Sequence, residues 1–225
     1  DTGTNMFLTV KAMQERLAQS EENAADRVLQ VMGEAALLNA RGNSGVILSQ
    51  FFVGLARGVE GKPKIDGRIL AHALKSASDS SYQAVGRPVE GTMLTVIRRA
   101  AEAAISSVNN ENHDVHTIMA AACREAKLAL AQTPELLPIL KQAGVVDAGG
   151  QGVLVILEAM RRSISGEEPG EPLIVLGDAA DLSGITNEFL DETEEDIYGY
   201  CTQFLLNGEE LDVGEIKQDM NNLAS

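Results

Sequence analysis

The sequence has no apolar run long enough to cross a membrane. Its longest strongly apolar stretch without a charge, residues 45–56, is interrupted by Ser49 and Gln50, whereas a membrane-spanning helix needs about 20 consecutive apolar residues. The start of the chain also lacks the basic cluster, apolar segment and small-residue cleavage site of a secretory signal. We therefore expect no membrane span and no export.

Cysteine is scarce as well. Only Cys123 and Cys201 are present, far apart in the sequence, which is typical of a reducing compartment. Cys123 lies in an Ala-rich helical pattern, where a buried, reduced thiol is expected. Together with the missing secretory signal, this predicts a cytoplasmic location.

Basic residues are almost absent from the C-terminal part of the chain. Residues 1–165 hold 17 Asp and Glu against 17 Lys and Arg, whereas residues 166–225 hold 16 acids against the single Lys217. The net charge of −15 therefore belongs to the tail, and no basic surface is available to neutralise phosphates along a duplex. This argues against nucleic acid as a partner and predicts a domain boundary near Ser165.

Several familiar catalytic patterns are also missing. The chain has neither the glycine-rich P-loop nor the dinucleotide fingerprint. Its three histidines, His72, His113 and His116, do not form a pair with metal-ligand spacing. Ser44 has no His and acid near it in sequence, so nucleophilic catalysis is not indicated.

The first 165 residues do carry a strong helical pattern. Apolar residues recurring at three- and four-residue spacing predict helices over residues 5–17, 22–40, 45–59, 66–85, 92–108, 114–132, 133–144 and 153–164. Asn5, Ser44 and Thr133 are the predicted N-caps of three of them, and residues 45–59 are apolar nearly all round, which indicates a buried helix. Eight helices without a strand predict an all-α fold, a closed bundle or barrel.

Beyond residue 165 the character changes. Residues 166–196 are acidic with few apolar side chains and are interpreted as a linker. Residues 197–206 carry Tyr198, Tyr200 and Phe204 at alternate positions, as a strand does, and residues 212–223 follow a helical pattern. Because one strand and one helix cannot bury a core, residues 197–225 are interpreted as the start of a second, α/β domain.

Four segments combine glycine with short polar residues at a predicted helix start. They are residues 1–5, 41–45, 90–93 and 147–152, with the sequences Asp-Thr-Gly-Thr-Asn, Arg-Gly-Asn-Ser-Gly, Glu-Gly-Thr-Met and Asp-Ala-Gly-Gly-Gln-Gly. Free N–H groups at a helix start bind anions, and glycine lets phosphate oxygens come close. If the four starts face one end of the bundle, they form a nucleotide site in which Asp1 and Asp147 are the carboxylates best placed to hold Mg²⁺.

Ordinary structural roles remain open for the same residues. A glycine before a helix is most often only a turn, and Asp1 and Asp147 are each as well suited to cap a helix as to bind a metal.

Taken together, the segments closely resemble the N-terminal domain of bacterial fatty acid kinase. This domain shares a superfamily, named DhaL or dihydroxyacetone (glycerone) kinase, with the nucleotide-binding subunit of dihydroxyacetone kinase. The similarity lies in residues 1–6, 40–50, 88–94 and 144–152, in the family's order and spacing, and spans residues 1–165. Residues 198–204 also resemble the start of that kinase's middle domain.

The resemblance implies an antiparallel eight-helix barrel that binds ATP at one open end. It implies an enzyme that moves the γ-phosphate of Mg-ATP to a fatty acid carboxylate, presented by a separate fatty-acid-binding protein, to give an acyl phosphate. A glycerone kinase-type subunit and a nucleotide-binding module without turnover are the alternatives. A homodimer formed through a C-terminal part beyond residue 225 is a further expectation.

The resemblance also assigns site residues. Asp1 matches the last aspartate of the family's Pro-Asp-Gly-Asp-Thr-Gly segment, which implies that it is a catalytic Mg²⁺ ligand and that the natural protein has a preceding segment. The residues implied to contact ATP are Thr2, Gly3, Thr4, Asn5, Asn43, Ser44, Gly45, Thr92, Met93, Asp147, Ala148 and Gly149.

Four features depart from the family's pattern or leave it incomplete. Ala148 and Gly150 differ from the Asp-Pro-Gly of the dihydroxyacetone kinase relative, and residues 133–137 hold no counterpart of its arginine. Cys201 matches a zinc ligand of the middle domain, but within this chain a metal-free thiol is expected.

Overall fold

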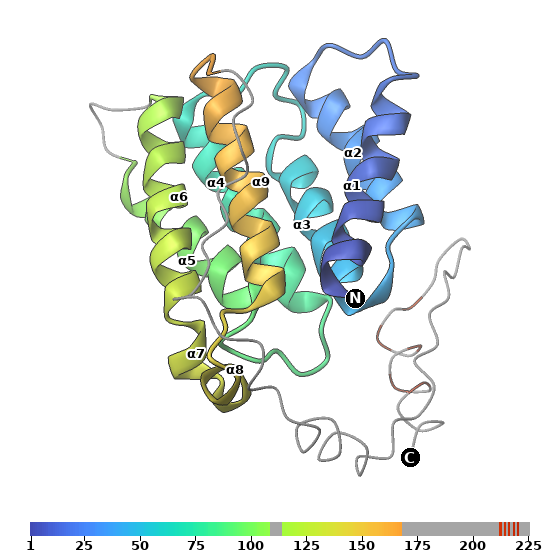
Figure 1. Ribbon diagram of the computed structural model, residues 1–225. Helices are drawn as coiled ribbons and strands as arrows, with labels where there is room; N and C mark the ends of the chain where they lie inside the picture. The colour runs from blue at the N-terminus through green and yellow to red at the C-terminus, as the bar shows by residue number, and fades with distance from the viewer. Residues whose placement is uncertain are drawn as a thin grey trace.

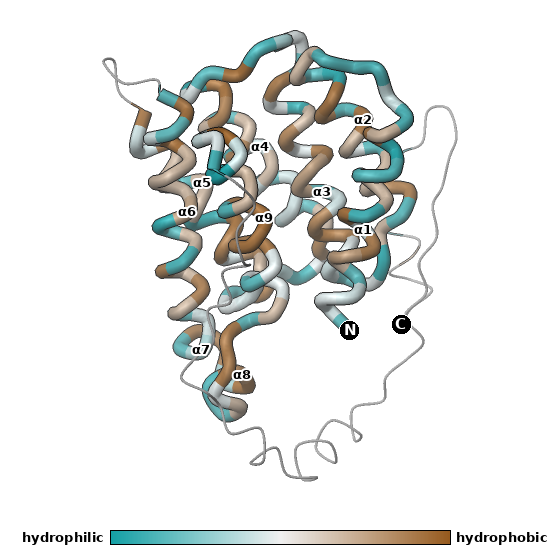
Figure 2. Tube along the Cα trace, turned by 45° about the horizontal axis from the view of Figure 1, so that its top comes forward, coloured by the Kyte–Doolittle hydropathy of each residue, from teal (hydrophilic) through white to brown (hydrophobic). Residues whose placement is uncertain are grey.

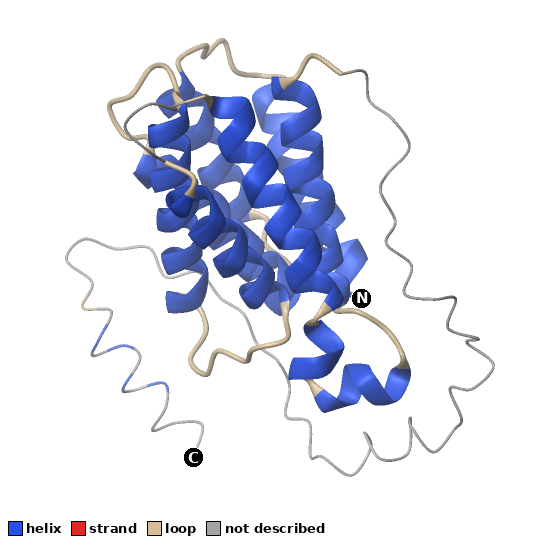
Figure 3. Cartoon of the chain, turned by 90° about the vertical axis from the view of Figure 1, so that its left-hand side faces the viewer, coloured by secondary structure: helices blue, strands red, loops and turns tan. Residues whose placement is uncertain are grey.

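The computed structural model describes residues 1–108 and 114–167 and, further along, Asp212, Gly214, Ile216, Gln218 and Met220. Residues 1–108 and 114–167 contain nine helices and no strand (Figures 1 and 3). The helices are α1 (Thr2–Leu17), α2 (Ala25–Leu38), α3 (Gly42–Gly58), α4 (Gly67–Gln83), α5 (Met93–Ser106), α6 (Val115–Ala131), α7 (Thr133–Leu136), α8 (Pro138–Ala143) and α9 (Ala148–Ile164). The predicted all-α class is confirmed.

The seven long helices form a closed ring. Each of α1 to α6 packs against the next, and α9 contacts both α6 and α1. Successive long helices run in opposite directions (Figure 1). As a result α1, α3, α5 and α9 all begin at one end of the bundle, the end that also holds the N terminus, whereas α2, α4 and α6 begin at the other.

Three helices begin where the sequence indicates, because a short polar side chain accepts a hydrogen bond from a free N–H group of the first turn. Asp66 accepts from the N–H of Ile69 at 2.8 Å and begins α4. Asp114 and Thr92 cap α6 and α5 in the same way.

The predicted N-caps Asn5 and Ser44 are wrong. Helix α1 begins at Thr2 because the Asp1 carboxylate accepts from the N–H of Thr4 at 2.8 Å, which places Asn5 inside the helix. Helix α3 begins directly after Arg41, with no side-chain cap, which places Ser44 in its first turn. Residues 2–5 and 42–45 therefore form the first turns of α1 and α3 and are not loops that precede these helices.

Two further boundaries differ from the prediction. The single helix expected over residues 133–144 is split into α7 and α8, because Pro138 has no N–H and disfavours a helical conformation at Leu137, which is extended. Thr133 lies within α7 and does not cap it. Helix α9 begins at Ala148 rather than at residue 153, so residues 148–152 form its first turns.

The core is built from small residues and amphipathic helices. Apolar and hydrophilic positions alternate along the helices (Figure 2), and many buried positions are alanines, such as Ala36, Ala77 and Ala122. Cys123 is buried, as predicted, and burial raises the pKa of its thiol to about 12. In the described ranges, no helix combines the length and the hydrophobicity that a membrane span requires.

The predictions for the C-terminal part fall mostly outside the described residues. The strand expected at residues 197–206 lies there, as does the acidic linker, apart from its first two residues. Of the alternate residues described further on, Gly214, Ile216, Gln218 and Met220 are helical, in line with the helix predicted over residues 212–223. The N–H of Ile216 donates to the carbonyl of Asp212 at 3.1 Å.

Candidate nucleotide site

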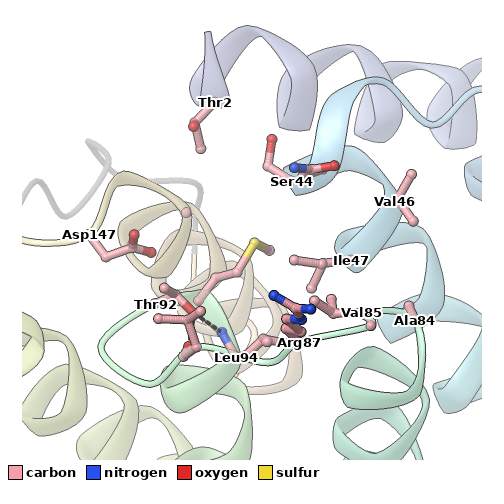
Figure 4. Close-up of a pocket in the computed structure, with 15 residues that line it drawn as sticks. Thr2, Ser44, Val46, Ile47, Ala84, Val85, Arg87, Thr92, Leu94 and Asp147 are labelled. Atoms are coloured by element: carbon pink, nitrogen blue, oxygen red, sulfur yellow. Dashed lines mark hydrogen bonds between the residues drawn. The ribbon is translucent and has the colours of Figure 1, made fainter. Parts of the chain in front are cut away.

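The starts of α1, α3, α5 and α9 surround one pocket at their shared end of the bundle (Figure 4). Its volume of about 490 Å³ lies within the range of small-molecule sites. The residues that line it are Thr2, Asn43, Ser44, Val46, Ile47, Ala84, Val85, Gly86, Arg87, Val89, Thr92, Met93, Leu94, Asp147 and Gly149. Each of the four glycine-containing segments contributes, although they are distant in sequence.

The pocket brings together about half of the residues implied to bind ATP. Those that line it are Thr2, Asn43, Ser44, Thr92, Met93, Asp147 and Gly149. Those in the same segments but outside the lining are Asp1, Gly3, Thr4, Asn5, Gly45 and Ala148. This second group lies in the first turns of α1, α3 and α9 or at their caps.

Two residues of the second group, Asn5 and Gly45, lie where the start of α1 meets that of α3. Gly42 has a φ of 58°, and a Cβ there would lie 2.3 Å from the amide nitrogen of Asn5. A Cβ at Gly45 would lie 3.0 Å from the hydroxyl of Thr9. Gly42 and Gly45 thus let the two helices approach closely, and Thr2 and Ser44 lie near each other at the same edge of the pocket (Figure 4).

Asp147 connects the starts of α9 and α5. Its carboxylate accepts from the N–H of Gly150 at 2.6 Å, and its own N–H donates to the buried hydroxyl of Thr133 at 3.0 Å. Burial raises the pKa of this carboxyl, and the backbone N–H groups of Gly150, Met93 and Gly149 oppose the rise only in part. The carboxylate is therefore a helix cap that also faces the pocket.

The glycines at the start of α9 are explained mainly by packing. A Cβ at Gly150 would lie 2.8 Å from a methyl group of Val96, and one at Gly152 would lie 2.7 Å from the sulfur of Met6. Only Gly149 of this run lines the pocket. The sequence pattern indicated a phosphate cradle here, but most of these glycines let α9 approach α5 and α1.

The connection between α4 and α5 is the part of the site that sequence reasoning missed. It supplies Ala84, Val85, Gly86, Arg87 and Val89. Among the described lining residues, Arg87 is the one cation. The available signal was the Gly-Arg-Pro turn at residues 86–88, directly before a recognised motif.

The pocket has a polar side and an apolar side. Thr2, Ser44, Thr92 and Asp147 lie on the polar side, at the helix starts (Figure 4). Val46, Ile47, Val85 and Leu94 lie on the other side, together with Arg87 (Figure 4). This arrangement suits a molecule with an anionic end, held by N–H groups and hydroxyls, and a less polar end that contacts aliphatic side chains and Arg87.

The described residues supply little for a metal. They contain no group of three or more His, Cys, Asp or Glu side chains placed to hold an ion. Asp1 offers a single exposed carboxylate, already engaged with Thr4. A Mg²⁺ ion at this end would therefore need phosphate oxygens and water for most of its ligands, as it commonly does at nucleotide sites.

Comparison with known families agrees with this geometry. Residues 1–162 match the DAK2 domain. The chain belongs to the DAK2 domain family. This domain is part of the dihydroxyacetone kinase superfamily, whose DAK2 domains bind ATP or ADP. The predicted superfamily is thus confirmed.

The DAK2 domain also has staphylococcal relatives. An uncharacterized protein of Staphylococcus aureus strain MRSA252 is 37% identical over 234 aligned residues, and others from the bovine strain RF122 / ET3-1 and strain USA300 are 36% identical. The alignments cover 100% of this chain but 42% of each relative. The chain therefore spans less than half the length of these relatives.

Proposed function

We propose that this DAK2 domain is the nucleotide-binding part of a kinase that phosphorylates a fatty acid. The acceptor is the carboxylate of the fatty acid, presented by a separate fatty-acid-binding protein, and the products are an acyl phosphate and ADP. The observation that carries the proposal is the convergence of four helix starts on one pocket with a polar and an apolar side.

The chain's own residues have distinct roles in this proposal. Asn43, Ser44 and Thr92 hold the phosphate chain together with the first N–H groups of α3, α5 and α9. Arg87 adds a positive charge at the same pocket. Asp1 holds Mg²⁺ from the start of α1. Bound Mg-ATP supplies the phosphoryl group that is transferred.

A carboxylate acceptor fits a pocket whose described lining holds one carboxylate, Asp147, and no histidine. One oxygen of the acceptor forms the new P–O bond while the bond to the leaving ADP oxygen breaks, and no proton has to be removed. The enzyme then needs only alignment and charge neutralisation. Asp147, the carboxylate that lines the pocket, is already engaged with the N–H groups of two helices.

Apolar residues near the pocket support docking of an acyl-presenting partner. Val89 lines the pocket and is 49% exposed, and Leu136 and Ile139 on α7 and α8 are similarly exposed. Helix α7 lies against the pocket wall, since a Cβ at Gly91 would be 3.0 Å from that of Leu136. A partner covering this surface would bring its acyl chain close to the site.

A glycerone kinase-type activity is the second candidate, because the DAK2 match places the chain in that superfamily. The Arg-Gly-Asn-Ser-Gly segment at residues 41–45 and the Tyr-Gly-Tyr-Cys segment at residues 198–201 resemble fatty acid kinase and favour the first candidate. A nucleotide-binding module without turnover is the third.

One assay separates the three. ATP consumption by the chain, with a full-length staphylococcal relative assayed in parallel, is measured with fatty acid plus its carrier and then with dihydroxyacetone plus its binding subunit. We expect turnover with the fatty acid only. Turnover with dihydroxyacetone alone would establish the second candidate, and ATP binding without turnover of either acceptor would establish the third.

The proposed role of Asp1 is tested by Asp1→Asn. Asparagine caps a helix as well as aspartate does, so α1 keeps its start while the charge is lost. We expect phosphoryl transfer to fall about 100-fold, as for loss of a charge-stabilising group, with an unchanged circular dichroism spectrum. Undiminished transfer would show that Asp1 holds no catalytic metal.

A further inference from the structure

A cluster of polar side chains lies behind the pocket wall, between the end of α4 and the start of α5. Glu90 is at its centre. One carboxylate oxygen accepts from the hydroxyl of Tyr82 at 2.8 Å, and the other accepts from the hydroxyl of Thr95 at 2.6 Å and from Arg98 at 2.9 Å. Arg98 also donates to the Tyr82 hydroxyl at 3.2 Å.

The same cluster holds the backbone of the turn before α5. Thr95 is 1% exposed, and its hydroxyl accepts from the N–H of Gly91 at 2.8 Å while it donates to Glu90. Gly91 has a φ of 85°, a conformation that favours glycine, and a Cβ there would lie 2.9 Å from that of Leu137. The turn is thus held from α5 by hydrogen bonds and from α7 by contact.

None of Tyr82, Glu90, Thr95 and Arg98 lines the pocket, yet they flank the segment that forms much of its wall. Residues 84–94 supply eight of the fifteen lining residues. Arg87 and Thr92 are among them, and the Thr92 hydroxyl donates to the carbonyl of Val89 at 2.8 Å within the same turn.

We propose that Glu90 is a positioning residue, which acts through Thr95 and the turn at Gly91 to set Arg87 and Thr92 for the nucleotide. The proposal rests on nucleotide binding at this pocket, not on the identity of the acceptor. Glu90 acts before binding, because a wall already held in place spares the nucleotide the entropy cost of ordering it.

The electrostatics of the cluster agree with this role. Burial alone would raise the pKa of Glu90, but hydrogen bonds from Thr95, Tyr82 and Arg98 outweigh it and lower the pKa. Glu90 is therefore ionised at neutral pH and engages all three neighbours. The Glu90 side chain is 47% exposed, so solvent screening keeps its electrostatic contribution to the stability of the turn modest. Substituting the buried Thr95 is therefore expected to have the larger effect.

The test compares Thr95→Val, Thr95→Ser and Glu90→Gln by titration calorimetry with ADP. Valine keeps the size of threonine but leaves the Gly91 N–H without its acceptor, whereas serine keeps the hydroxyl. We expect the Kd for ADP to rise about ten-fold in Thr95→Val, a smaller rise in Glu90→Gln, and rescue to within about two-fold in Thr95→Ser. Glu125→Gln, which breaks the Arg99–Glu125 ion pair away from the pocket, is the matched control and should bind ADP as the parent does.

A kinetic measurement separates positioning from a general loss of structure. In the phosphotransfer assay, the KM for ATP should rise in Thr95→Val and Glu90→Gln while kcat stays within about two-fold, because Arg87 and Thr92 are intact once ATP is bound. ADP affinity equal to that of the parent in either Glu90→Gln or Thr95→Val would overturn the positioning role of Glu90. Failure of the parent itself to bind ADP would instead overturn the nucleotide site of the proposed function.

Discussion

The two ends of α3 use glycine for different purposes. At its start, Gly42 and Gly45 admit the side chains of Asn5 and Thr9 from α1, beside the pocket residues Asn43 and Ser44. At its other end, a Cβ at Gly54 would lie 2.5 Å from the Cα of Ala77, and one at Gly58 would lie 2.4 Å from that of Ala73. The start of the helix serves the site, and its end serves only the packing of α3 on α4.

This difference predicts that substitutions at the two ends of α3 will have different main effects. Enlarging a residue where backbones touch forces the helices apart, because the obstacle is main chain rather than the tip of a side chain. Changing a residue at the pocket start removes a hydrogen-bonding group that faces the cavity, where space is available. The first should alter mainly the free energy of unfolding, and the second mainly the affinity for nucleotide.

The largest effect is expected at the α3–α4 contact. Gly54→Ala and Gly58→Ala should each lower the free energy of unfolding by about 1–3 kcal/mol, measured by urea denaturation, with ADP affinity of the folded protein retained. Gly86→Ala is the matched control, because nothing lies within 4 Å of a Cβ there, and it should change stability by less than about 0.5 kcal/mol. If Gly86→Ala lowered the free energy of unfolding as much as Gly54→Ala or Gly58→Ala, the close packing of α3 on α4 would not explain the loss.

The next effect is expected at the pocket. Asn43→Ala and Ser44→Ala should each raise the Kd for ADP about ten-fold, as for a hydrogen bond to a charged group, while thermal unfolding stays close to that of the parent. Ser163→Ala, an exposed serine in the last turn of α9, serves as the control. A stability loss without an affinity loss would assign these residues to the helix rather than to the site.

A smaller and mixed effect is expected at Gly42. Alanine there is strained at positive φ by about 1 kcal/mol and also displaces the Asn5 amide, so both stability and ADP affinity should fall. In an Asn5→Ala background the same substitution should cost less, because the displaced group is gone. Double-mutant cycles measure this difference, and strict additivity would mean that Asn5 does not hold the two helix starts together.

The smallest effect concerns the pH dependence of stability. It is expected for Asp147, a charged residue at the pocket, and not for Gly54 at the α3–α4 contact. Burial raises the pKa of Asp147, so the folded protein holds this proton more tightly than the unfolded chain does. The contribution to stability is present below the ordinary carboxyl pKa and is lost as pH rises through the raised value. Asp147→Asn, which keeps the cap, should therefore stabilise the protein more at pH 7 than at pH 3 in urea titrations, whereas Gly54→Ala should show the same deficit at both.

Much of the fold could be predicted from local patterns. The apolar spacing placed the long helices, and Asp66, Thr92 and Asp114 mark the starts of three of them because a cap depends on an N–H group two or three residues along the chain. The prediction was wrong at Asn5, because Asp1 caps the same helix, and at Ser44 and Thr133, because α3 and α7 begin without a side-chain cap. The split at Pro138 was missed, although proline chemistry explains it.

The site could be predicted only in part. The four segments that surround the pocket were recognised, whereas residues 84–87 were missed, because a single arginine among small and apolar turn residues forms no recognisable pattern in the sequence. The glycines at residues 150 and 152 were assigned to phosphate, but they face Val96 and Met6. Whether a glycine admits a ligand or a neighbouring helix depends on what lies opposite it.

By itself, the sequence determined the long helices, the caps at Asp66, Thr92 and Asp114 and the four glycine-containing segments, because these depend on residues within one or two turns of each other. The tertiary structure alone decided that every second long helix begins at the same end, which gathers those segments around one pocket. It also decided that Arg87 joins them and that Glu90, Thr95, Tyr82 and Arg98 support the wall from behind. The reason is physical: a helix start offers free N–H groups wherever it lies, but a site requires several such starts, a cation and an apolar surface within one small volume, and only the antiparallel closure of the ring brings them there.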